Sequence, residues 1–141
     1  MLIIFTACTS NEDCKLSEEI LGRWELISAE AINCDSPSDN FERIEVGADG
    51  CLRVDSERVI CDVVVVFSSN GTAISSILQS NGDTEENMFT YIVNEMNNTA
   101  SLCRVDNEDL CPTISLISCN EMTWFFVSDD NCNWTYDFIK I

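Results

Sequence analysis

Histidine is absent from this sequence of 141 residues, and lysine occurs only twice, at Lys15 and Lys140. The absence of histidine removes the usual general base and the commonest metal ligand. It also excludes Ser-His-Asp and Cys-His arrangements for nucleophilic catalysis. Two lysines leave few candidates for Schiff-base chemistry. We therefore expect a protein that is not an enzyme and has no metal or cofactor; catalysis by paired carboxylates or an external metal is the remaining alternative.

Basic residues are scarce as well, with 7 against 25 acidic ones and a net charge of −18. Nucleic-acid phosphates and anionic membrane surfaces both attract clustered Lys and Arg, so neither is expected as an electrostatic partner. No apolar run approaches the roughly 20 residues of a membrane-spanning helix. Hydrophobic residues make up 45% of the chain, which is enough for one packed domain. We expect a monomer whose acidic surface keeps it soluble.

Cysteine, by contrast, is abundant, and nine cysteines in so short a chain indicate an oxidising environment. No two of them form a C-x-x-C pair, so a zinc ribbon or a thioredoxin-like site is a poor fit. The odd number requires a separate fate for one of them. The nine are Cys8, Cys14, Cys34, Cys51, Cys61, Cys103, Cys111, Cys119 and Cys132.

Cys8 follows an apolar run, Leu2 to Phe5, and the small residues Thr6 and Ala7. This resembles the end of a bacterial lipoprotein signal peptide, in which the cysteine is lipidated and becomes the mature N-terminus. The adjacent Asn11-Glu12-Asp13 is similar to the export signal of Bacteroidetes surface lipoproteins. The resemblance implies a signal-peptide remnant and tether over residues 1–15 and a lipid-anchored protein at the bacterial outer membrane or cell surface. The alternative is a buried or disordered apolar stub.

If Cys8 is lipidated, eight cysteines remain and can form four disulfides, which we expect to be structural. Eight cysteines allow 105 pairings, so the sequence does not determine the connectivity. Cys51 with Cys61, and Cys103 with Cys111, are plausible local pairs if each joins neighbouring strands.

The remainder of the chain, residues 16–141, is predicted to be one β-domain preceded by a short helix. The helix covers Leu16–Leu21, with Ser17 as a possible cap and Gly22 as its end. From Trp24 onward, segments rich in Val, Ile, Thr and aromatic residues alternate with turns, of which Asn70-Gly71 and Asn81-Gly82 are strong hairpin signals. The predicted strands are Arg23–Ala31, Arg43–Val46, Cys51–Asp55, Val59–Ser68, Thr72–Gln79, Met88–Glu95, Thr99–Val105, Thr113–Cys119, Met122–Val127 and Trp134–Ile141.

Strands joined by short turns form an antiparallel up-and-down meander, and its edges are best removed by closing it into a barrel. An all-β barrel is therefore the expected fold. An up-and-down barrel commonly has about eight strands, so we expect some of the short strands to merge or to be loops. A long loop around one brief strand is expected between Asn33 and Gly50.

Gly22-Arg23-Trp24 after a short helix, together with Phe67-Ser68-Ser69-Asn70-Gly71-Thr72 and the terminal Phe138-Ile139-Lys140, resembles the lipocalin family, and most closely its small lipoproteins from Bacteroidetes. The resemblance implies that Trp24 fills the closed end of the barrel, that the helix caps it, and that a basic residue of the last strand covers the indole. Lys140 is the candidate for that residue; an exposed terminal lysine without a partner is the alternative.

The resemblance also implies that a small apolar ligand binds at the open end of the barrel. Period-two spacing places Phe89 with Tyr91, and Trp124 with Phe126, on one face of each strand. The alternative, which we favour for most of these residues, is that large aromatics fill a solid core. The candidate ligand-binding residues are Phe89, Tyr91, Trp124, Phe126, Trp134 and Tyr136.

An alternative function is an accessory or adhesion module with a filled barrel, acting through its acidic outer surface and possibly with calcium. Asp129 to Asn133 places oxygen side chains at alternate positions, like the start of a calcium loop. The glycine and the glutamate that such a loop requires are both missing. A solvated hairpin turn explains this segment better, and it also explains the acidic run Asp106 to Asp109.

Overall fold

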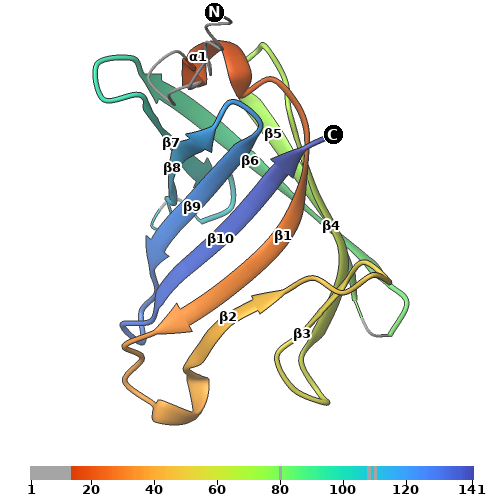
Figure 1. Cartoon of the computed structure of the whole chain (residues 1–141). Helices are drawn as coiled ribbons and strands as arrows, with labels where there is room; N and C mark the ends of the chain where they lie inside the picture. Colours follow the sequence, from red (N-terminus) through yellow and green to blue (C-terminus); the bar gives the residue numbers. More distant parts are fainter. Residues whose placement is uncertain (1–13, 80, 108, 110) are drawn as a thin grey trace, which may run out of the picture.

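The described part of the chain is a single antiparallel sheet that follows a short helix (Figure 1). The structure is a computed structural model that describes residues 14–79, 81–107, 109 and 111–141. Helix α1 spans Leu16–Glu19, and a 3₁₀ turn, η2, spans Pro37–Asp39. The strands are β1 (Gly22–Ile32), β2 (Phe41–Glu45), β3 (Cys51–Arg53), β4 (Val59–Phe67), β5 (Thr72–Gln79), β6 (Thr84–Asn94), β7 (Thr99–Arg104), β8 (Thr113–Ser118), β9 (Glu121–Val127) and β10 (Asn133–Lys140).

The sheet closes into a barrel because β1 pairs with β10 on one side and with β4 on the other. Eight strands, β1 and β4 to β10, form the closed barrel, which confirms the predicted antiparallel meander. All ten predicted strands are present, so the expected merging of the short ones was wrong. Instead, β2 pairs with β1 and β3 pairs with β4 outside the closed ring.

A bulge in β1 explains how the edge of this strand opposite β10 pairs with both β4 and β2. Its register shifts between Leu26 and Ser28, and the carbonyl of Ile27 accepts a hydrogen bond from the Val46 amide, 2.9 Å away. Before the bulge β1 pairs with β4, and after it β1 pairs with β2. Because a bulge bends its strand and increases its twist, β1 turns away from β4 at this point.

A second bulge lies at the matching level of β4. Its register shifts between Cys61 and Val64, and Asp62 has a positive φ of 49°. The Asp62 amide donates to the carbonyl of Gly50, which leads into β3. Gly50 has a positive φ of 79°, and a Cβ there would lie 2.7 Å from the Asp62 carboxylate, so both its backbone angle and its surroundings favour glycine beside this bulge. The two bulges together open the barrel at one end, where β2 and β3 spread apart (Figure 1).

Helix α1 lies across the other end of the barrel (Figure 1). It is shorter than predicted, and Ser17 does not cap it, because Ser17 lies inside the helix. The cap comes instead from Asn98 in the turn between β6 and β7. Its side-chain oxygen accepts from the Leu16 amide at 2.8 Å, and its amide donates to the Cys14 carbonyl at 3.1 Å. A side chain distant in sequence therefore fixes the helix on the barrel.

Four disulfides staple the loops of the barrel. The two local pairs that the spacing suggested, Cys51–Cys61 and Cys103–Cys111, are present. Cys14–Cys119 joins the segment before α1 to the β8–β9 turn, and Cys34–Cys132 joins the loop after β1 to the β9–β10 turn. These two link residues 105 and 98 positions apart. Cys8, the predicted lipidation site, lies outside the described residues.

Candidate ligand-binding site

The closed end of the barrel is built around Trp24, which is fully buried. Its indole nitrogen donates to the Ile20 carbonyl at 2.9 Å. Lys140 covers the ring, with Nζ 5.5 Å from the ring centroid. The same Nζ donates to the Glu19 carbonyl at 2.8 Å and lies 3.5 Å from the Glu19 carboxylate. The Trp24 indole N–H and the Lys140 ammonium group therefore both have protein partners, and the resemblance to lipocalins implied that a basic residue covers the indole.

Gly22 makes the entry from the helix into β1 possible. Its φ of 111° lies in the region that residues with a side chain rarely adopt. A Cβ at this position would meet Lys140 Cε at 3.6 Å, an ordinary contact. The backbone angle, rather than crowding, is therefore the reason for glycine in the Gly-x-Trp motif.

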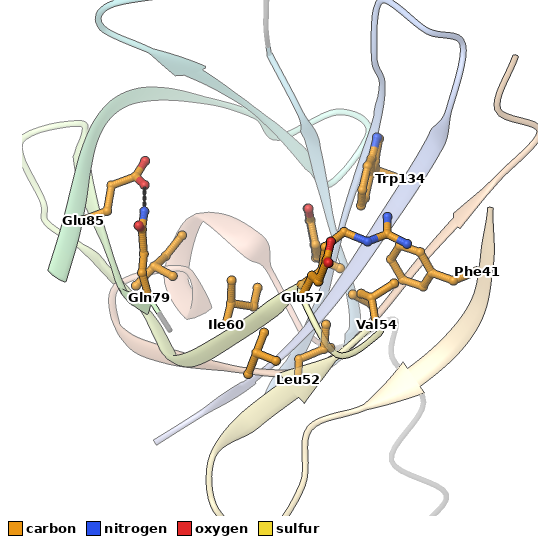
Figure 2. A pocket seen from close by; sticks show the side chains of 13 residues that line it. Phe41, Leu52, Val54, Glu57, Ile60, Gln79, Glu85 and Trp134 are labelled. Atoms are coloured by element: carbon orange, nitrogen blue, oxygen red, sulfur yellow. Dashed lines mark hydrogen bonds between the residues drawn. The ribbon is translucent and has the colours of Figure 1, made fainter. Parts of the chain in front are cut away.

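The open end holds a cavity of about 400 Å³, which we call the mouth chamber (Figure 2). It lies where β1 and β4 separate, and β2 and β3 contribute to its wall. Apolar residues of six strands form most of the lining: Ala29, Phe41, Leu52, Val59, Ile60, Ile77, Trp134 and Tyr136. A cavity of this size falls within the range of small-molecule sites.

A second cavity of about 170 Å³, the inner chamber, adjoins the first. The two share Ile60, Ile77 and Tyr136 in their linings. Towards the closed end, the inner chamber is bounded by Trp124, whose ring lies 4.5 Å from that of Phe138. The two chambers are therefore neighbours, and their mainly apolar linings extend from the open end toward the packed core.

Five of the six predicted ligand-binding aromatics line these chambers. Phe89, Trp124 and Phe126 line the inner chamber, Trp134 lines the mouth chamber, and Tyr136 lines both. Tyr91 lines neither. Its hydroxyl donates to the Ser68 carbonyl at 2.5 Å and its ring packs edge-on against Phe67, so it belongs to the wall near the β4–β5 turn.

Three of these rings form a stacked group. Phe126 and Trp134 are nearly parallel, at 8° and 6.0 Å between centroids, and Trp134 and Tyr136 are inclined by 24° at 5.9 Å. Phe41 meets Trp134 edge-on at 5.7 Å. Phe41 was not predicted as a site residue, because it lay in the predicted long loop, two residues before the strand predicted at Arg43–Val46; in the structure it is the first residue of β2.

The β3–β4 hairpin also lay outside the predicted site. Leu52 and Val54 line the mouth chamber from this hairpin, and their period-two spacing is the signal that could have identified them. The hairpin adds two charged lining residues, Glu57 and Arg58. Arg58 donates from Nε to the Asp55 carboxylate at 2.7 Å, and this bond holds the pKa of Asp55 below its ordinary value.

Tyr136 has the most shielded titratable side chain of the site. Burial raises the pKa of its phenol to about 12, so the hydroxyl stays protonated at neutral pH. Among the described residues, none forms a hydrogen bond with this hydroxyl, in contrast to the hydroxyl of Tyr91. The mouth therefore holds a neutral hydroxyl that forms no hydrogen bond within the described part of the chain.

The suggested calcium loop is a turn whose oxygens bind protein groups. The Ser128 hydroxyl donates to the Asp130 carboxylate and lowers the pKa of Asp130. The Asn131 amide donates to both Asp35 oxygens, at 3.0 and 3.1 Å. In the second acidic loop, Arg104 engages both Asp106 oxygens. Within the described part of the chain, no three His, Cys, Asp or Glu side chains gather in a metal-binding group.

The fold is that of a lipocalin-like barrel. A lipocalin-like protein from Bacteroides uniformis superimposes with a TM-score of 0.53 at 12% identity, over 87% of this chain and 99% of that one. A redesigned β-barrel matches with a TM-score of 0.45 at 11% identity, over 92% and 97% of the two chains. The sequence matches no protein-family model, and no curated protein resembles it significantly.

Proposed function

We propose that this protein binds a small apolar molecule in the mouth and inner chambers and does not act on it chemically. The observation that supports this most is the pair of adjoining cavities, both lined by aromatic side chains and sharing Ile60, Ile77 and Tyr136. Buried apolar surface supplies roughly 25 cal/mol per Å² on binding. Few polar groups line the two cavities, as is usual where they orient a ligand rather than react with it.

Transport or storage is the role that such a site suits best. The disulfides fit an extracytoplasmic location. As part of the proposal, a lipid on Cys8 tethers the barrel to the bacterial outer membrane and presents its open end to the surroundings; two or three acyl chains would be needed for stable anchoring. In the described part of the chain, no helix has the length and apolar character to cross a membrane. The alternative role as an accessory module required a filled barrel, and the two chambers argue against it.

The test is a titration with the neutral fluorescent probe N-phenyl-1-naphthylamine on the oxidised protein. Phe126→Ala removes a ring from the inner chamber, and we expect it to weaken probe binding about tenfold or more. Phe125→Ala is the matched control, because Phe125 is the adjacent residue on β9, is 45% exposed and lines neither chamber. Absence of probe binding to the wild type, or equal weakening by both variants, would contradict the proposal.

Native mass spectrometry of protein released gently from its own host tests the remaining parts. It reports a lipid on Cys8 by mass, counts the disulfides and detects a retained ligand. A mature protein without lipid would remove the tether from the proposal, but it would leave the binding site untouched.

A further inference from the structure

The charged side chains are unevenly distributed between the linings of the two chambers. Its four charged side chains are Glu57, Arg58 and Glu85 in the mouth chamber and Arg104 in the inner one. Both arginines are neutralised by carboxylates outside the lining, Arg58 by Asp55 and Arg104 by Asp106. Among the described residues, neither glutamate forms an ion pair. The mouth therefore has an excess of negative charge.

Glu85 is held in place without being neutralised. The Gln79 amide donates to one of its oxygens at 2.5 Å (Figure 2). The Asn87 amide donates to the other oxygen at 3.1 Å. Both donors are neutral, so they orient the carboxylate and leave its charge available. The pKa of Arg104 is raised mainly by its hydrogen bond to Asp106, and the more distant Glu85 contributes least.

The aromatic groups of the mouth favour the same sign of charge in a ligand. Ring faces attract cations through their quadrupole, most strongly in tryptophan. Trp134 and Tyr136 lie on the β10 wall, and Phe41 and Trp134 lie together on the side of the chamber away from Gln79 and Glu85 (Figure 2). The Tyr136 hydroxyl, which has no hydrogen bond to a described residue, can accept one from an ammonium group, because its oxygen has free lone pairs.

We propose that the ligand is a cationic amphiphile: an apolar body, flat enough to lie against the stacked rings, that carries an amine or quaternary ammonium group. The apolar body occupies the inner chamber and the positive group stays in the mouth, where Glu57 and Glu85 supply negative charge and Trp134 supplies an aromatic wall. Apolar carboxylates of the fatty-acid kind are rejected, because their charge would meet Glu57 and Glu85, which form no ion pair with any residue that the structure describes. This inference rests on the proposed function and narrows it to one ligand class.

Three probes of matched size test the sign of the charge: 2-naphthylmethylamine (a cation at pH 7), 2-naphthylmethanol (neutral) and 2-naphthoate (an anion). Each is titrated calorimetrically into the oxidised protein at low ionic strength. We expect the cation to bind at least about tenfold more tightly than the anion, with the neutral probe between them, and added salt to reduce the difference. If the anion binds as well as the cation, this inference fails and the proposed function stands. If none of the three binds, both fail.

Charge-neutral variants test where the selectivity arises. Glu57→Gln and Glu85→Gln each remove one mouth charge, and we expect each to reduce the cation-to-anion ratio at least threefold. Glu86→Gln is the matched control, because Glu86 follows Glu85 on β6, is exposed and lines neither chamber, yet changes the net charge equally. We expect a ratio within twofold of the wild type. An equal effect of all three variants would place the selectivity in the overall charge of −18 rather than in the mouth, and would overturn the assignment.

Discussion

Trp24 and Trp134 lie at opposite ends of the β1–β10 strand pair and have different structural roles. At the closed end, Trp24 pairs with Lys140, and at the open end Trp134 pairs with Ala31. Trp24 is fully buried, its indole N–H is bonded within the barrel base, and a cation covers its face. Trp134 is half-buried, and its ring lines a cavity. Small partners on β1 create this difference, because Ala31 and Ala29 leave room beside Trp134 and Tyr136.

The comparison shows that the residues that stabilise the fold and the residues that line the cavities lie at opposite ends of the barrel. Burial of apolar surface stabilises a fold only where protein atoms fill the space, and an unfilled aromatic surface is left for a ligand. The two bulges mark the boundary between these regions, since β1 and β4 pair on the closed side and separate on the open side. We therefore expect substitutions at the two ends to affect different measurements.

The largest effects on stability and on probe binding are expected from substitution of the two tryptophans. Trp24→Ala should lower the free energy of unfolding by about 3–5 kcal/mol, because it leaves a cavity in a fully packed site. Trp134→Ala should lower it by less than about 2 kcal/mol, since the ring loses mainly its aromatic contacts, but should weaken probe binding about tenfold. Urea denaturation and probe titration measure the two quantities. If Trp24→Ala does not fold, Trp24→Phe replaces it; equal losses of stability at both ends would break the comparison.

The disulfides at the two ends of the barrel should differ by about 2 kcal/mol in what each contributes to the free energy of unfolding. Cys14–Cys119 at the closed end closes a separation of 105 residues, and Cys51–Cys61 beside the mouth closes one of 10. Loop-closure entropy then assigns about 4.7 kcal/mol to the first and about 2.7 kcal/mol to the second. Paired Cys→Ser variants in urea denaturation measure these losses. A larger loss from the Cys51–Cys61 pair would show that the mouth hairpin contributes more to the folded state than loop closure predicts.

The closed end was also the part that the sequence predicted best. Gly22 and Trp24 belong to one short motif, and Lys140 lies at the end of the last strand, β10. Their relative positions therefore do not depend on the lengths or conformations of the loops. Strand alternation and turn residues located all ten strands, because side-chain direction in a strand depends only on position along it. The two local disulfides followed from similar logic, since Cys51–Cys61 joins the neighbouring strands β3 and β4, and Cys103–Cys111 joins β7 to the segment just before β8.

The open end was harder to predict, because it depends on long-range geometry. Inward-facing residues of β1 change from Trp24 and Leu26 to Ala29 and Ala31 across the bulge, and a pattern of period two does not locate such a shift. The contribution of β2 and β3 to the mouth follows from the divergence of β1 and β4. Tyr91 was placed with Phe89 by alternation alone, yet it lies beyond the inner chamber.

The pH dependence of stability should reveal the half-buried tyrosine of the mouth, Tyr136. The pKa of Tyr136 is raised by burial to about 12, against about 10 in an unfolded chain. Between these values the unfolded chain loses the phenolic proton and the folded one keeps it, so stability is complete below pH 10 and falls as the pH rises. The expected loss is at most about 1.4 kcal/mol per pH unit. Tyr136→Phe should remove this slope in urea denaturation between pH 9 and 11, apart from a smaller part due to Tyr91, whose pKa burial also raises. An unchanged slope would mean that Tyr136 is solvated.

The smallest expected effect concerns the cation over the closed end. Lys140→Met keeps the apolar stem over Trp24 and removes the ammonium group, together with its contact to the ring and its hydrogen bond to Glu19. We expect a loss of about 1 kcal/mol in the free energy of unfolding, because the group is partly exposed and screened by solvent. Probe affinity should not change, since the chambers lie on the far side of Trp124. A variant that keeps its stability but loses probe binding would show that the two ends are coupled through β10, and that the bulges do not isolate the mouth from the base of the barrel.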